Sequence, residues 1–127
     1  FPVYGKLEAC GLTFHVLESH GGHQYGQVFL LEPEAGLFFT VDSALNLKSI
    51  SPERTRYNQL ADLFMTSVNV DSDLARKERK DLMAIAAEYT EKSTEPFYIC
   101  CGHGAVSLIR DGKLSAFGTT ERYTHKK

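Results

Sequence analysis

Short apolar segments, each bounded by glycine, proline or charged residues, recur along this chain and constrain its fold more than any other feature. Segments of this length that are rich in branched and aromatic residues are typical of β-strands. We therefore predict about six strands, at residues 12–17, 27–31, 37–41, 97–100, 106–109 and 114–117.

Two connections between these segments have the composition of hairpin turns. Pro33 and Gly36 lie between the second and third segments, and tight turns favour both residue types. Asp111 and Gly112 separate the last two segments, and Asp-Gly between apolar runs is a strong hairpin signal. The sequence therefore predicts two antiparallel hairpins.

Helical patterns occupy the interval between the third and fourth strands. A first helix is expected from Ser51, which can cap it, and its apolar positions 57, 60, 61 and 64 share one face. A second helix is expected after Asp71, with Leu74, Leu82, Ile85 and Tyr89 on one face, and should end before Pro96. The charged residues 76–81 are expected to form a solvated face. The predicted fold class is α/β, a mixed sheet of about six strands with two helices packed on one face.

The composition fits one folded domain over residues 1–127, with residues 119–127 as a flexible tail. A formal charge of −2 disfavours nucleic acid and anionic membranes as partners. No segment approaches the roughly 20 apolar residues of a membrane span, and the N-terminus does not resemble a signal peptide, so a cytoplasmic location is expected. The chain opens at Phe1, close to strand-like sequence, and we expect it to be part of a longer protein.

Three motifs each contain a residue able to bind a metal ion. His23 lies in Gly-His-Gln-Tyr-Gly at residues 22–26, Asp42 ends Phe-Thr-Val-Asp at residues 39–42, and His103 lies in Cys-Gly-His-Gly at residues 101–104. Two imidazoles and a carboxylate suit Zn, Fe or Mn. Each residue also has an ordinary structural interpretation, as a solvated loop histidine, a turn or capping aspartate, and a histidine in a tight turn.

The cysteines allow two further interpretations of these motifs. Cys100 or Cys101 could join His20, His23 and His103 in a zinc site, although the spacing of Cys101 and His103 is tighter than in known structural zinc sites. Cys101 could also be a nucleophile paired with His103. A disulfide framework is not expected, because the chain has three cysteines and two of them are adjacent.

The order and spacing of the three motifs resemble the C-terminal half of the metallo-β-lactamase fold hydrolases, over roughly residues 10 to 112. Family members carry a Gly-His-Thr-Pro-Gly-like turn, a strand ending in Phe-Thr-Gly-Asp, two helices, and a strand ending in Pro-Gly-His-Gly. The departures here are Val41 for the glycine, Gln24 and Tyr25 for threonine and proline, and Cys101 for the second proline.

The resemblance implies a metal-binding role for each of the three residues. His23 would bind the first metal ion, Asp42 would bridge two ions, and His103 would bind the second. The implied metal is zinc, with iron or manganese as alternatives. The remaining ligands of the family come from a His-x-His-x-Asp-His motif in its N-terminal half, and no segment of this sequence matches that motif.

The resemblance also implies a fold and a function. The chain would be half of an αβ/βα sandwich and the C-terminal portion of a metal-dependent hydrolase, in which a metal-bound hydroxide attacks an ester, thioester, amide or phosphoester. This portion alone is expected to be inactive. Its inner sheet face would be covered by the missing N-terminal half or by a second copy of the chain. The alternative function is a non-catalytic binding or dimerisation module that retains the half-fold.

Overall fold

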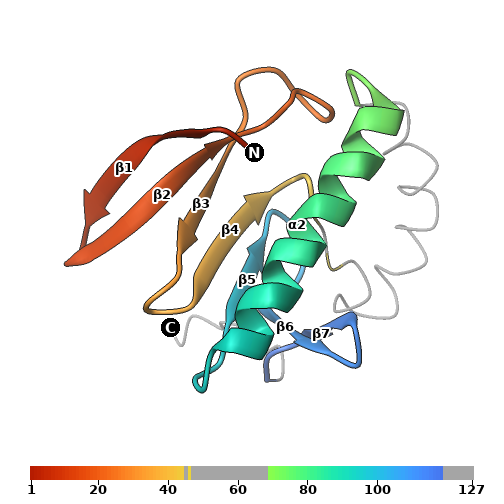
Figure 1. Ribbon diagram of the computed structural model, residues 1–127. Helices are drawn as coiled ribbons and strands as arrows, with labels where there is room; N and C mark the ends of the chain where they lie inside the picture. The colour runs from red at the N-terminus through yellow and green to blue at the C-terminus, as the bar shows by residue number, and fades with distance from the viewer. Residues whose placement is uncertain (45, 47–68, 119–127) are drawn as a thin grey trace, which may run out of the picture.

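A computed structural model describes residues 1–44, 46 and 69–118 (Figure 1). These residues form one open mixed sheet and one helix, which confirms the predicted α/β class. Its elements are β1 (Val3–Ala9), β2 (Leu12–Glu18), β3 (Val28–Glu32), β4 (Leu37–Val41), α2 (Ser72–Lys92), β5 (Tyr98–Cys101), β6 (Ser107–Arg110) and β7 (Lys113–Ala116).

The strands lie in the sheet in the order in which they occur along the chain. β4 and β5 are parallel, and every other neighbouring pair is antiparallel. The parallel pair requires a long crossover, and the interval that contains α2 provides it. Both predicted hairpins are present, since β3 pairs with β4 and β6 pairs with β7.

The described sheet has seven strands instead of about six, because the sequence did not predict β1. β1 is an edge strand without a single buried residue, and Tyr4 is 81% exposed. A strand without a buried face lacks the apolar alternation by which strands are recognised. Its partner β2 follows through Cys10 and Gly11, whose φ angles of 53° and 74° are those of a tight two-residue hairpin.

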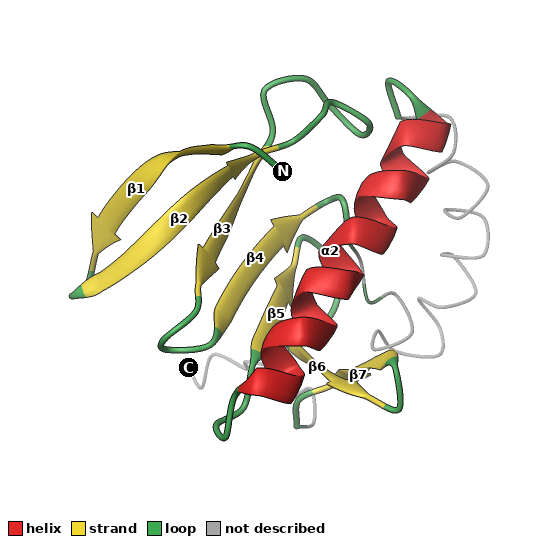
Figure 2. Cartoon of the chain, in the orientation of Figure 1, coloured by secondary structure: helices red, strands yellow, loops and turns green. Residues whose placement is uncertain are grey.

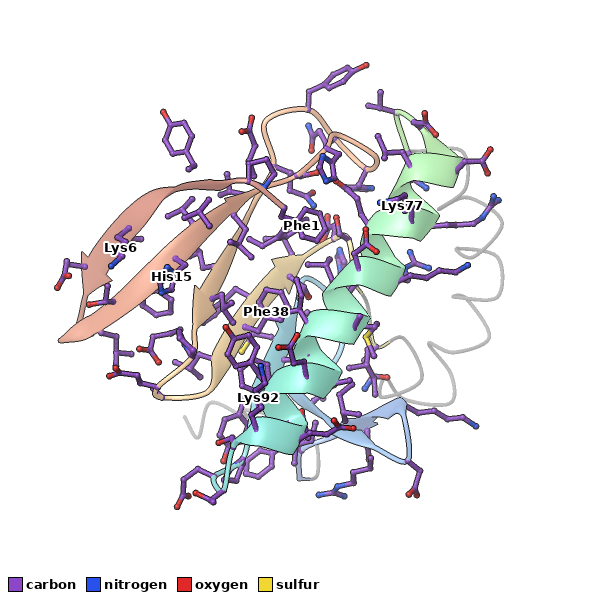
Figure 3. All side chains as sticks on the ribbon, in the orientation of Figure 1. Phe1, Lys6, His15, Phe38, Lys77 and Lys92 are labelled. Carbon is purple, nitrogen blue, oxygen red and sulfur yellow. The ribbon has the colours of Figure 1, made fainter. Side chains whose placement is uncertain are left out.

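The helix α2 begins and ends where the sequence predicts. The Oδ1 atom of Asp71 accepts hydrogen bonds from the backbone of Asp73 and Leu74, at 3.0 and 2.9 Å, and so caps the first turn. The helix packs across one face of the sheet (Figure 2), where Leu82 and Ala86 join Phe38 and Ile99 in the core. Figure 3 shows Phe38 beside α2, and Lys6 and His15 on the part of the β1–β2 hairpin that lies away from it.

One prediction for α2 is wrong. Glu78 was expected on a solvated face, but its side chain is fully buried. It lies three residues after Ala75 and four residues before Leu82, both of which are buried, so helical geometry turns it toward the sheet. The helix predicted from Ser51 and the tail predicted at residues 119–127 lie outside the described residues. Within the described ranges, no helix has the length and hydropathy that crossing a bilayer requires.

Candidate functional site

The three predicted metal ligands lie at one edge of the sheet. Asp42 and His103 follow the parallel strands β4 and β5, and His23 lies in the connection from β2 to β3. β2 runs in the same direction as β4, since both are antiparallel to β3, so all three residues lie at the ends of strands on the same edge.

Each imidazole faces a different oxygen of the Asp42 carboxylate. The His23 Nε2 atom lies 3.7 Å from Asp42 Oδ2, and the His103 Nε2 atom lies 3.5 Å from Asp42 Oδ1. Both distances exceed those of N–H···O hydrogen bonds, about 2.7–3.2 Å. The structure therefore gives two separate pairs of donor atoms, one on each side of a shared carboxylate.

Neither pair is a complete metal site by itself. Among residues 1–44, 46 and 69–118, no group of three or more histidine, cysteine, aspartate or glutamate side chains is arranged to hold one ion. Each side of Asp42 offers one imidazole nitrogen and one carboxylate oxygen. Further donors from outside this group would be needed to complete the coordination of a zinc ion.

The His23 ring is oriented by a residue that the sequence analysis did not single out. Its Nδ1 atom lies 2.8 Å from the Oδ1 atom of Asn69. The amide oxygen is an acceptor, so the contact places a proton on Nδ1 that is donated to Asn69, and Nε2 is the nitrogen that faces Asp42. A metal ligand at Nε2 needs its ring proton on Nδ1.

The loop that carries His23 lies directly on the beginning of α2. The backbone N–H groups of Val70 and Asp71 donate to the carbonyl oxygens of His23 and Gly22, at 3.1 and 2.9 Å. A Cβ atom on Gly22 would overlap the backbone of Ala75, with the Ala75 Cα atom only 2.6 Å away. Glycine at this position therefore allows the loop to touch the helix backbone.

The loop that carries His103 lies against the segment that carries Asp42. The N–H group of Gly102 donates to the Val41 carbonyl oxygen at 2.8 Å, and the N–H group of Asn46 donates to the His103 carbonyl oxygen at 3.2 Å. A Cβ atom on Gly102 would overlap Asp42 Oδ1 and would lie 2.7 Å from the Val41 carbonyl carbon. The glycine before His103 is thus required by the close approach of the Asp42 carboxylate.

Val41, immediately before Asp42, has an unfavourable backbone conformation. Its φ angle of 42° lies in the left-handed region, which β-branched residues rarely adopt. The side chain is 37% exposed and so gains little from packing at this position. Strain of this kind next to a candidate ligand is a reason to examine the position experimentally.

The structure does not favour the two alternatives that involve cysteine. Burial raises the pKa of the Cys101 thiol and also that of Cys100, whereas a nucleophilic cysteine needs a lowered pKa. No described cysteine joins histidines in a group of three or more metal-binding side chains. The ring of His20 stacks on Phe1, with 5.2 Å between ring centroids.

A cleft elsewhere in the molecule is separate from these residues. It has a volume of about 520 Å³ and lies between the tip of the β1–β2 hairpin and the β3–β4 turn, with Lys6, His15 and Glu34 among its lining residues. Asp42 lies at the opposite end of β4 from that turn. Comparisons of the chain with protein-family models, with curated proteins and with solved structures gave no match.

Proposed function

We propose that the chain is the C-terminal portion of a metal-dependent hydrolase with the metallo-β-lactamase fold, and that His23, Asp42 and His103 are ligands in its metal centre. The observation that carries the proposal is the arrangement of two imidazole nitrogens around different oxygens of one carboxylate. The mixed sheet, with a helix on one face, supports the finer expectation that the domain is half of an αβ/βα sandwich.

The separations between each imidazole nitrogen and its Asp42 oxygen match those of two ligands bound to the same metal ion. Zinc lies about 2.0–2.2 Å from imidazole nitrogen and carboxylate oxygen, so two ligands of one tetrahedral ion are about 3.4 Å apart. The separations of 3.7 and 3.5 Å are close to that value on both sides of Asp42. Iron and manganese accept the same donor types and are retained as alternatives.

The chain's own residues would divide the work at this centre. Asp42 would supply a carboxylate oxygen to each side, His23 and His103 would supply one Nε2 atom each, and Asn69 orients the His23 ring through its Nδ1 atom. A bound zinc ion supplies water that is deprotonated near neutral pH, the nucleophile needed to hydrolyse an ester, thioester, amide or phosphoester. No described residue distinguishes among these substrates.

The face of the sheet opposite α2 carries exposed apolar side chains, which supports the proposal that another part of the protein covers it. Phe38 points into the core beneath α2, so its neighbour Phe39 points to the other face, where it packs on Phe14 and is 37% exposed. Val28 and Phe117 are also exposed. We propose that the N-terminal half of the protein, or a second copy of the chain, covers this apolar face and supplies the remaining ligands.

Zinc titration of the purified chain tests the proposed centre. Calorimetry should detect binding that is lost in Asp42→Asn, because this carboxylate serves both sides. His23→Ala should reduce the affinity more than His103→Ala, because the His23 ring is already oriented by Asn69. His15→Ala is the matched control, since His15 lines the separate cleft beside the β3–β4 turn, at the opposite end of β4 from Asp42. Equal zinc affinities in all variants would reject these three residues as ligands. Absence of zinc, iron and manganese binding would show that the three residues hold no ion in this chain without the remaining ligands.

The second candidate function is a non-catalytic binding or dimerisation module. The exposed apolar side chains opposite α2 favour it, because such a surface needs no metal to bind a partner. Sedimentation experiments combined with zinc titration distinguish the two. A module should form a stable dimer that dissociates in Phe39→Glu and should bind no zinc, iron or manganese, whereas the hydrolase portion should bind metal and lose that binding in Asp42→Asn. A His-x-His-x-Asp-His motif in the coding sequence upstream of Phe1 would instead favour the hydrolase.

A further inference from the structure

The most unusual side chain outside the three candidate ligands is Glu78 of α2. It is completely buried, although glutamate is rarely buried without partners. Its Oε1 atom accepts hydrogen bonds from the Ser19 hydroxyl, at 2.7 Å, and from the backbone N–H of His20. Its Oε2 atom has no hydrogen-bond partner among the described residues. Burial of a carboxylate oxygen without a hydrogen-bond partner costs free energy, so the two hydrogen bonds at Oε1 are the contacts that hold Glu78 in place.

The partners of Glu78 belong to the loop that carries His23. Ser19 Oγ also accepts a hydrogen bond from the Gly21 N–H at 3.0 Å, and the Ser19 N–H donates to the Gln27 carbonyl oxygen at 3.0 Å. Glu78 therefore holds the first half of the loop. The middle of the loop, at Gly22 and His23, is held by Asp71, Val70 and Asn69.

We propose that Glu78 is a positioning residue, which fixes the loop on α2 so that the His23 ring faces Asp42. The inference rests on the proposed metal centre for its functional meaning, but the positioning itself concerns only this chain. Without the acceptor at Glu78, residues 19–21 lose their attachment to the helix. His23 then depends on Asn69 and on backbone contacts two residues away from the released segment.

Two substitutions at Glu78 separate positioning from simple burial. Glu78→Gln keeps an oxygen acceptor and places an amide group where Oε2 lacks a partner, whereas Glu78→Leu keeps the volume and removes the acceptor. In hydrogen-exchange NMR of the full chain, Glu78→Leu should speed exchange at His20 and Gly21 about ten-fold or more, as expected for loss of a hydrogen bond to a carboxylate. Glu78→Gln should remain close to the wild type. Glu88→Leu, on the exposed side of the same helix, is the matched control.

The functional consequence is read from zinc binding. Glu78→Leu should weaken zinc binding by about ten-fold, the effect typical of residues that orient a metal ligand, and Glu78→Gln should restore it. If Glu78→Leu does not fold, Ser19→Ala removes one of the two hydrogen bonds without changing the helix and should produce the same changes to a smaller degree.

Two outcomes distinguish failure of this inference from failure of the proposed function. Unchanged loop exchange and an unchanged His23 ring signal in a folded Glu78→Leu protein would reject the positioning role. Faster loop exchange with a shifted His23 signal, in a chain whose wild type binds no zinc, would support the positioning role and would show that His23, Asp42 and His103 hold no zinc ion in this chain by themselves.

Discussion

The loop that carries His23 and the loop that carries His103 face the same carboxylate, but they are held in different ways. The His23 loop lies on α2, and its imidazole is 13% exposed and hydrogen-bonded to Asn69. The His103 loop is hydrogen-bonded to Val41 and Asn46, and its imidazole is 62% exposed. An oriented, buried ligand loses less entropy on binding than an exposed one. We therefore expect a metal ion to bind more tightly on the His23 side than on the His103 side. The following substitutions test whether the two loops differ in this way.

The largest effect is expected where the His23 loop meets the helix. Gly22→Ala should lower the free energy of unfolding by about 3 kcal/mol, because the new methyl group overlaps the backbone of Ala75 in a buried contact. Urea denaturation measures the change. Gly5→Ala is the control, since a Cβ atom there meets nothing within 4 Å and the stability should be unchanged or slightly higher. A Gly22→Ala protein as stable as the wild type would show that the loop is not fixed on α2.

A smaller effect is expected in the His103 loop. Gly102→Ala should cost about 2 kcal/mol, because its methyl group displaces the Asp42 carboxylate, a side chain that can rotate, and presses on Val41. The fold should survive and the Asn69–His23 contact should remain. NMR of the backbone amides of Val70 and Asp71, which donate to His23 and Gly22, checks this, because their signals should change in Gly22→Ala and stay in Gly102→Ala. Equal changes in both variants would mean that the two loops are not independent.

The third prediction concerns the side chain that orients His23. Asn69→Leu removes the acceptor of the Nδ1 proton, with a cost of about 1 kcal/mol. The nitrogen chemical shifts of the His23 ring should then indicate a mixture of tautomers, whereas Asn69→Asp, which keeps an acceptor, should retain the proton on Nδ1. If the His23 ring of Asn69→Leu still carries its proton on Nδ1 alone, a group other than Asn69 sets the tautomer.

The position of the candidate ligands could be predicted from the sequence, because it follows from strand direction. His23, Asp42 and His103 each follow a predicted strand, and the parallel arrangement of β4 and β5 brings the last two together. The roles of Asn69 and Glu78 could not be predicted. Asn69 meets His23 across 46 positions of sequence, and Glu78 meets Ser19 across 59, so no local pattern reports either contact. Glu78 also stands among charged residues, which concealed its burial.

β1 and Val41 show two other limits of a sequence reading. β1 has no buried residue, so no burial pattern marks it. The sequence shows a valine at position 41 where the resembling family has glycine, but it does not show the backbone conformation there. The left-handed φ of 42° at Val41 arises where the chain turns from β4 to Asp42. The pairing of β1 and the conformation of Val41 both depend on the path of the backbone, and the spacing of apolar residues does not indicate that path.

The smallest predicted effect is a gain of stability at Val41. The left-handed conformation costs an L-residue about 1–2 kcal/mol, and glycine in its place costs about 0.5–1 kcal/mol in backbone entropy, so Val41→Gly should raise the free energy of unfolding by about 0.5–1 kcal/mol. Val28→Gly is the matched control, because Val28 is 40% exposed, close to the 37% of Val41, and is not among the positive-φ residues. It should lower the stability, as glycine does in an ordinary strand. Equal losses of stability in the two variants would mean that Val41 is not strained.

Zinc affinity shows whether the strain at Val41 serves the candidate site. If Val41→Gly is more stable and binds zinc as the wild type does, the strain is not needed to orient Asp42. If it is more stable but binds zinc more weakly, the valine restricts the carboxylate to the orientation between the two imidazoles.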